Sequence, residues 1–204
     1  MKPPARRARS GFTLTELLAG VAVLSVLVAV AAPALRGARR AAQRAACLSQ
    51  LQSLGQALTL ARDADRGLLP YADRPADVRL GFLEPFNRLA QEMSVRPPSL
   101  DASGDVRTAA PWACPADDRA AVSGVSYAYA PADVMTLWAQ RDAARRWTTL
   151  YFESDPMTVV MFDWQRNHGP ADNAPALGLI GINVLRMDGG AEPGHPGLRL
   201  APRR

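Results

Sequence analysis

The sequence predicts an α+β fold, in which a long amino-terminal helix packs against a small antiparallel sheet. Two observations support this prediction. An uncharged run from Leu17 to Leu35 continues directly into an alanine-rich amphipathic segment, and the strand-like segments all lie late in the chain. A helix first and strands later are typical of α+β domains. A chain of 204 residues has room for such a helix and one head domain of ordinary size.

The uncharged run predicts a membrane-spanning helix, which we assign to residues 12–35. About 19 residues at 1.5 Å each come close to the roughly 20 needed to cross the hydrocarbon core. A core helix of a globular protein rarely stays apolar on every face for this length. We therefore expect the lipid bilayer to be a partner.

The basic residues gather before this helix and not in the head. Lys2, Arg6, Arg7 and Arg9 lie in the first ten residues, and without them 20 basic residues face 19 acidic ones. The net charge of +5 therefore predicts no nucleic-acid partner. A conventional secretory signal has the same basic and apolar regions, and an A-x-A site lies in residues 29–34, so that interpretation stays open.

Residues 36–66 predict an amphipathic extension of the helix. Cys47, Leu51, Leu54 and Leu58 recur at helical spacing and form one apolar stripe. Pro33 should kink the helix, while the alanine-rich residues after it favour continuation. A helix over residues 12–65 would be roughly 80 Å long, so its second half should stand outside the membrane and pack against something.

The head is expected to occupy residues 67–204. Its local patterns predict a helix at 82–93, a loop at 97–108, a strand at 125–130, a helix at 133–145, strands at 148–152, 157–163 and 179–187, and a turn at 188–190.

The most specific motif is Ser10-Gly11-Phe12-Thr13-Leu14-Thr15-Glu16, which runs directly into the apolar helix. A glycine leaves a protease room to approach the backbone closely. Glu16 is the only ionisable residue between Arg9 and Arg36, and an acidic group inside a membrane segment costs roughly 2.5 to 3.5 kcal/mol on insertion scales. It therefore needs a partner, or must lie near enough to the end of the run to reach the lipid headgroups.

This motif resembles the type IV prepilin and type II secretion pseudopilin family. The resemblance implies that a prepilin peptidase removes residues 1–11 by cutting between Gly11 and Phe12, and that Phe12 becomes N-methylated. It implies that Glu16, the fifth mature residue, pairs with the freed amino group of a neighbouring subunit during assembly. Pro33 lies where many such helices carry a proline.

The resemblance also places the leader in the cytoplasm and the head on the other side of the inner membrane. The charge count does not decide this orientation, because four arginines after the helix balance the four basic residues before it (Arg36, Arg39, Arg40 and Arg44). The implied partners are other pilin-like subunits, in a homo- or hetero-polymer, and an inner-membrane assembly platform.

The head resembles prepilin-type proteins of planctomycetes and related bacteria. The landmarks are residues 46–51, 54–55, 112–117, 167–169, 183–185 and 188–189. In that group a histidine is followed by an Asp-Gly turn near the carboxyl terminus. This chain departs from the pattern in two ways: the gap from His168 to Asp188 is longer, and Gly190 stands where a second histidine commonly follows.

The two cysteines, Cys47 and Cys114, are too few for a disulfide framework and lack metal-ligand spacing. Because the expected compartment is oxidising, we predict a single disulfide between them rather than two buried thiols. It would close a loop of roughly 67 residues and add about 4 kcal/mol in the chain-entropy model.

No pattern predicts an enzyme, a cofactor or a metal site. The acidic and imidazole side chains that could form such a site show no catalytic or metal-ligand spacing (Asp163, His168, Asp172, Asp188, Glu192 and His195). Asp188 and Glu192 alone do not predict a calcium site. The leading function is a structural subunit of a secretion pseudopilus or pilus-like fibre. A singly anchored binding module that does not polymerise is the alternative, and a membrane-tethered enzyme has the least support.

Overall fold

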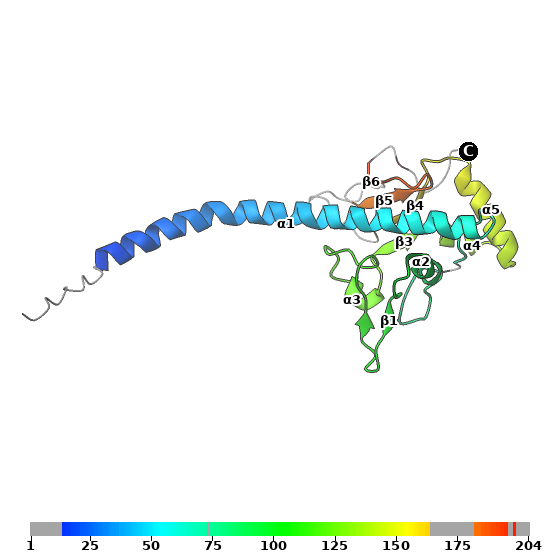
Figure 1. Cartoon of the computed structure of the whole chain (residues 1–204), viewed down its shortest axis with the longest axis horizontal. Helices are drawn as coiled ribbons and strands as arrows, with labels where there is room; N and C mark the ends of the chain where they lie inside the picture. Colours follow the sequence, from blue (N-terminus) through cyan, green and yellow to red (C-terminus); the bar gives the residue numbers. More distant parts are fainter. Residues whose placement is uncertain (1–13, 73, 164–181, 196–197, 199–204) are drawn as a thin grey trace, which may run out of the picture. The chain divides into compact units, whose positions relative to one another are not determined.

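The structure is a computed structural model that describes residues 14–72, 74–163, 182–195 and 198. It divides into two compact units, residues 1–41 and residues 42–204. Helix α1 (Leu14–Ala64) begins in the first unit and ends in the second (Figure 1).

The first unit contains the apolar half of α1. Pro33 lies inside the helix, which continues through it to Ala64, as the alanine-rich sequence after Pro33 predicts. The proposed kink at Pro33 stays a prediction.

The second unit is the head, an α+β structure as predicted. After α1 its elements are α2 (Phe86–Met93), β1 (Ser99–Leu100), β2 (Val106–Arg107), α3 (Ala120–Ser123), β3 (Tyr127–Tyr129), α4 (Pro131–Met135), α5 (Arg141–Glu153), β4 (Val159–Asp163), β5 (Asn183–Arg186) and β6 (Ala191–Pro193). Strands β3 to β6 form an antiparallel sheet in the order β3-β4-β5-β6, and β1 and β2 form a separate hairpin.

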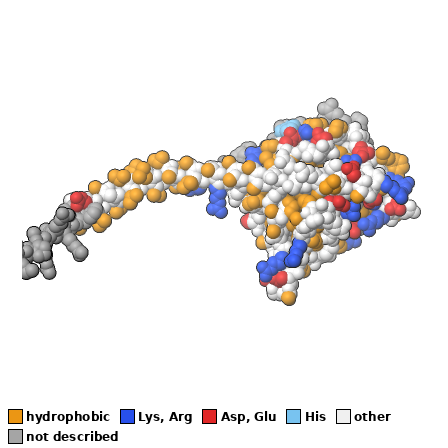
Figure 2. Space-filling model, viewed as in Figure 1, with side chains coloured by type: hydrophobic (Ala, Val, Ile, Leu, Met, Phe, Trp, Pro, Cys, Tyr) orange, Lys and Arg blue, Asp and Glu red, His pale blue; other side chains and the backbone are white. Residues whose placement is uncertain are grey.

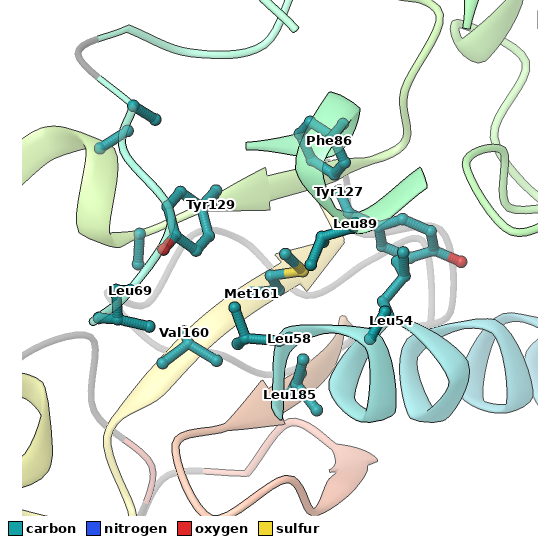
Figure 3. Packing of buried hydrophobic residues seen from close by; sticks show 14 of the residues in the cluster. Leu54, Leu58, Leu69, Phe86, Leu89, Tyr127, Tyr129, Val160, Met161 and Leu185 are labelled. Atoms are coloured by element: carbon teal, nitrogen blue, oxygen red, sulfur yellow. The ribbon is translucent and has the colours of Figure 1, made fainter. Parts of the chain in front are cut away.

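The second half of α1 forms one wall of the head's core. Its apolar stripe is completely or almost completely buried (Cys47, Leu51, Leu54 and Leu58). Figure 3 shows Leu58 of α1 near Met161 of β4 and Leu185 of β5, and Leu54 near Tyr127 of β3; all five belong to one buried cluster. The amphipathic extension therefore supplies part of the core of the second compact unit, residues 42–204.

Two predictions in the first part of the head are corrected. Helix α2 begins at Phe86 and not at residue 82, because Pro85 lacks a backbone N–H and disfavours helical geometry at the residue before it. The expected loop at 97–108 contains the β1–β2 hairpin, with Ser99 opposite Arg107. Its turn is held by Asp101, whose pKa falls to about 2 because Ser103 and the backbone of Asp105 donate hydrogen bonds to the carboxylate.

The strand predicted at 148–152 is wrong, and so is the single helix at 133–145. That helix is divided into α4 and α5, and α5 continues through residues 148–152 to Glu153. Ala144, Thr148 and Phe152 are buried at intervals of four residues, which is helical spacing. The tertiary contacts favour the helix over the strand propensity, since the Leu69 N–H donates a hydrogen bond to Thr149 Oγ1.

Cys47 and Cys114 form a disulfide in the structure, with the Cα atoms 5.1 Å apart. It joins α1 to the segment before α3, across a sequence separation of 67 residues. Both residues are buried in the main core.

We predict that this disulfide stabilises the head by about 4 kcal/mol, since it closes a long loop in the unfolded chain. Replacing both residues (Cys47→Ala with Cys114→Ala) should lower the free energy of unfolding by that amount, measured by denaturant titration of the full chain in detergent. A non-reducing peptide map of the parent is the control. Two free thiols in protein isolated without reductant would contradict the pairing.

Gly55 permits the close approach of α1 to the sheet. A Cβ atom placed on it would lie 2.7 Å from Leu185 Cδ1 and 3.3 Å from the carbonyl oxygen of Gly189. Leu185 is fully buried, so its side chain has little room to move away. The helix therefore packs against β5 and the β5–β6 turn only because residue 55 has no side chain.

We predict that Gly55→Leu lowers the free energy of unfolding of the head by about 1 to 3 kcal/mol, the usual cost of overpacking a core. Gly37→Leu is the matched control, because a Cβ there has no neighbour within 4 Å. Thermal unfolding of the two variants should separate them. Equal melting temperatures would show that the helix moves away from the sheet at little cost.

Candidate functional site

The cleavage and methylation residues predicted from the sequence, Gly11 and Phe12, lie outside the described residues. The described chain begins with Leu14, Thr15 and Glu16 at the start of α1, and all three are exposed. Glu16 lies in the first turn, where a carboxylate interacts favourably with the positive end of the helix dipole. The structure thus gives Glu16 a stabilising position in the helix besides its expected role in assembly.

The apolar half of α1 is exposed on all sides within the structure. The large apolar side chains from Leu14 to Leu35 are between 55% and 76% exposed, and in Figure 2 they cover this part of the helix almost without interruption. A core helix of the same composition would bury one or more faces. This part of the helix is long and apolar enough to cross a membrane.

A network of hydrogen bonds surrounds the disulfide and includes several head landmarks. The Gln43 side chain donates to the Pro115 carbonyl, and the Cys114 N–H donates to Ser126 Oγ. Tyr127 donates to Gln50 Oε1 at 2.7 Å; burial, with a smaller effect from Asp163, raises the pKa of its hydroxyl well above the usual value, so it stays a donor. These contacts attach the segments around residues 43–50 and 112–127 to each other.

The carboxylates of Asp188 and Glu192 are arranged around an arginine. Arg186 contacts Asp188 at 2.7 Å and Glu192 at 3.0 Å, so its guanidinium lies between the two acidic side chains. His195 Nε2 lies 3.8 Å from Glu192. His168 and Asp172 lie outside the described residues, and within those residues no three His, Cys, Asp or Glu side chains group as metal ligands.

Asp163 is buried at the end of β4, where its carboxylate accepts a hydrogen bond from the Asn183 N–H of β5. The two residues are adjacent across the sheet, since Phe162 pairs with Val184. This contact fixes the start of β5.

The head has a cavity of about 410 Å³ that the sequence did not predict. It is lined mainly by apolar groups from three separate segments: residues 74–82, residues 123–133 and Phe162. Arg74 stacks over the Phe82 ring, 4.6 Å from its centroid. No local pattern could have indicated the cavity, because it exists only where these distant segments meet.

The head also has an exposed aromatic patch that the sequence did not predict. Trp138 and Trp147 stack at a centroid distance of 6.0 Å with their planes 12° apart, and Leu137 and Leu150 are exposed as well. Trp147 keeps 56% of its surface exposed. We call these four residues the tryptophan patch.

Comparison with known proteins identifies the amino terminus. Residues 6–32 match the model of the prokaryotic N-terminal methylation motif, which covers the expected cleavage site, Glu16 and most of the apolar helix. No curated protein and no solved structure matches the chain. The motif belongs to a structural, pilin-type family and not to an enzyme family. The amino terminus of the chain therefore carries the processing motif of type IV prepilin-like proteins, and this motif runs into a helix that is long and apolar enough to cross a membrane.

Proposed function

We propose that the chain is the precursor of a non-enzymatic structural subunit that assembles into a type II secretion pseudopilus or a type IV pilus-like fibre. A prepilin peptidase cuts between Gly11 and Phe12 and methylates the new amino terminus. The mature subunit stays in the inner membrane with its head in the periplasm until an assembly platform moves it into the fibre, beside identical or different pilin-like subunits.

The observation that carries this proposal is the methylation motif at the start of an apolar helix whose large side chains are exposed among the residues that the structure describes. Such a surface requires either lipid or other helices around it. Glu16 lies at the start of this surface, where it is costly in hydrocarbon and gains from a positive partner. In a bundle of such helices, the amino group freed by cleavage would supply that partner.

The tryptophan patch supports contact with further proteins. Stacked, partly exposed indole rings beside exposed leucines are unusual on a head that acts alone, and aromatic side chains are enriched in protein interfaces. The patch lies on α5 and the segment before it, away from the sequence that carries the processing motif. It therefore offers the head a contact of its own.

The cavity favours a second function, that of a singly anchored binding module. A mainly apolar hollow with a few polar groups is typical of small-ligand sites. Such a module would carry the same processing motif and yet stay a single subunit in the membrane. Crosslinking in the intact membrane separates the two functions, since only a polymer gives a ladder of linked subunits.

We predict that the mature amino terminus is an N-methylated Phe12. The basic leader, the small residue at the junction and Glu16 at its fixed distance all support this cut. Mass spectrometry of protein purified from a host with a prepilin peptidase should detect it, and Gly11→Leu should leave the precursor uncut. An intact Met1, or a terminus near Ala32, would contradict the prediction.

We predict that Glu16→Gln is processed normally but enters fibres poorly. The substitution keeps the size of the side chain and removes its charge, so insertion into the membrane becomes easier and pairing with a neighbouring amino group is lost. In hydrocarbon that pairing is stronger than the roughly 0 to 1 kcal/mol of a surface ion pair. The measurement is the ratio of fibre-associated to membrane-extracted subunit.

Glu16→Asp is the control, because it keeps the charge on a shorter side chain. It should restore part of the incorporation that Glu16→Gln loses. Equal incorporation of Glu16→Gln and the parent would contradict the charge-pairing mechanism. Glu16 would then be interpreted as a residue at the end of the helix whose side chain reaches the lipid headgroups.

A further inference from the structure

We propose that Arg36, Arg39 and Arg40 form a binding site for the phosphate groups of anionic phospholipids, at the end of the membrane span from which the head follows. The proposal requires the membrane-spanning helix alone. It does not depend on cleavage, methylation or assembly, so its failure would leave the proposed function untouched.

The position of the three arginines along the helix matches the phosphate layer. The uncharged run ends at Leu35, and Arg40 is five residues beyond it, or roughly 8 Å along the helix axis. The headgroup region adds about 5 to 8 Å on each side of the hydrocarbon core. When the apolar run fills the core, all three side chains therefore start within the headgroup region.

Their position around the helix lets them act together. Arg36 is three residues from Arg39 and four from Arg40, so the three side chains project within an arc of about 100°. All three are exposed in the structure. A planar guanidinium group can bind two phosphate oxygens at once. Neighbouring guanidinium groups on one face of the helix can bind the same phosphate or the phosphates of adjacent lipids.

The three charges are free to bind an anion from outside the described part of the chain. Within the described residues none of them has an ion pair, and α1 has no acidic residue between Glu16 and Asp63. Like charges three and four residues apart on a helix destabilise it. A bound phosphate would remove that repulsion.

The chemistry of the head favours lipid over a second copy of the chain as the source of the anion. Many of the head's carboxylates are already paired with arginines of the same chain: Asp65, Glu84, Glu92, Asp101, Glu153, Asp188 and Glu192. A second copy would have to bring its remaining carboxylates to the end of the membrane span, whereas a membrane with anionic lipids supplies phosphates at that depth.

Arg44 marks the end of the site. It is half-buried and its Nε atom is enclosed, while the side chain of the preceding residue, Gln43, donates to the Pro115 carbonyl of the head. Arg44 therefore belongs to the packed head, and the lipid site consists of the three exposed arginines before it.

The test uses the full chain reconstituted in phosphatidylcholine vesicles with a trace of spin-labelled phosphatidylglycerol or spin-labelled phosphatidylcholine. Electron paramagnetic resonance separates lipids in contact with protein from bulk lipids. The parent should prefer phosphatidylglycerol up to about fivefold, the ratio given by about 1 kcal/mol for a basic residue near the surface. The preference should fall in 0.5 M salt, because the Debye length then shortens to about 4 Å.

The triple variant Arg36→Gln, Arg39→Gln, Arg40→Gln should bring the ratio close to one. The matched control removes three exposed arginines of the head (Arg79→Gln, Arg119→Gln and Arg146→Gln), so it has the same net charge as the first triple variant. The control should keep the lipid ratio of the parent. An equal loss in both variants, or a parent without preference, overturns the site. If the first triple variant loses subunit crosslinks while keeping the lipid ratio, the arginines bind another protein and the proposal is wrong.

Discussion

The burial of one side of α1 against the sheet is the interaction on which the rest of the head depends. The sheet alone has few strands, and its inner face would be exposed without Leu51, Leu54 and Leu58. The absence of a side chain at Gly55 permits the close approach of helix and sheet, and the disulfide at Cys47 joins the same part of the helix to the segment before α3. A subunit built in this way cannot lose the second half of its helix and keep its core.

The same helix meets two different environments. Its first half exposes apolar side chains in every direction, whereas its second half buries a single stripe and leaves the other side exposed. The change comes between Leu35 and Gln43, in a segment of small residues and arginines. The side chains of this segment can lie in water or among lipid headgroups. The helix can therefore continue without a break from its apolar half to its amphipathic half.

The sequence predicted what depends on a regular pattern within one segment. The long helix, its apolar stripe at Leu51 and Leu54, and the strands that became β3 and β4 all have a clear period. It failed at residues 148–152, where β-branched and aromatic side chains indicated a strand and contacts with Leu69 stabilise a helix. The cavity and the tryptophan patch were missed because each combines residues that only the tertiary structure brings together.

The distribution of charge along α1 gives a physical reason for regulated assembly. In the mature subunit we propose, the charges at one end of the span are a carboxylate and an amino group, and those at the other end are Arg36, Arg39 and Arg40. Leaving the bilayer separates the arginines from lipid phosphates, while entering the fibre lets Glu16 pair with a neighbour. The first change opposes extraction and the second favours incorporation. The two contacts lie at opposite ends of the proposed span, so extraction from the bilayer and incorporation into the fibre change the free energy of the subunit in opposite directions.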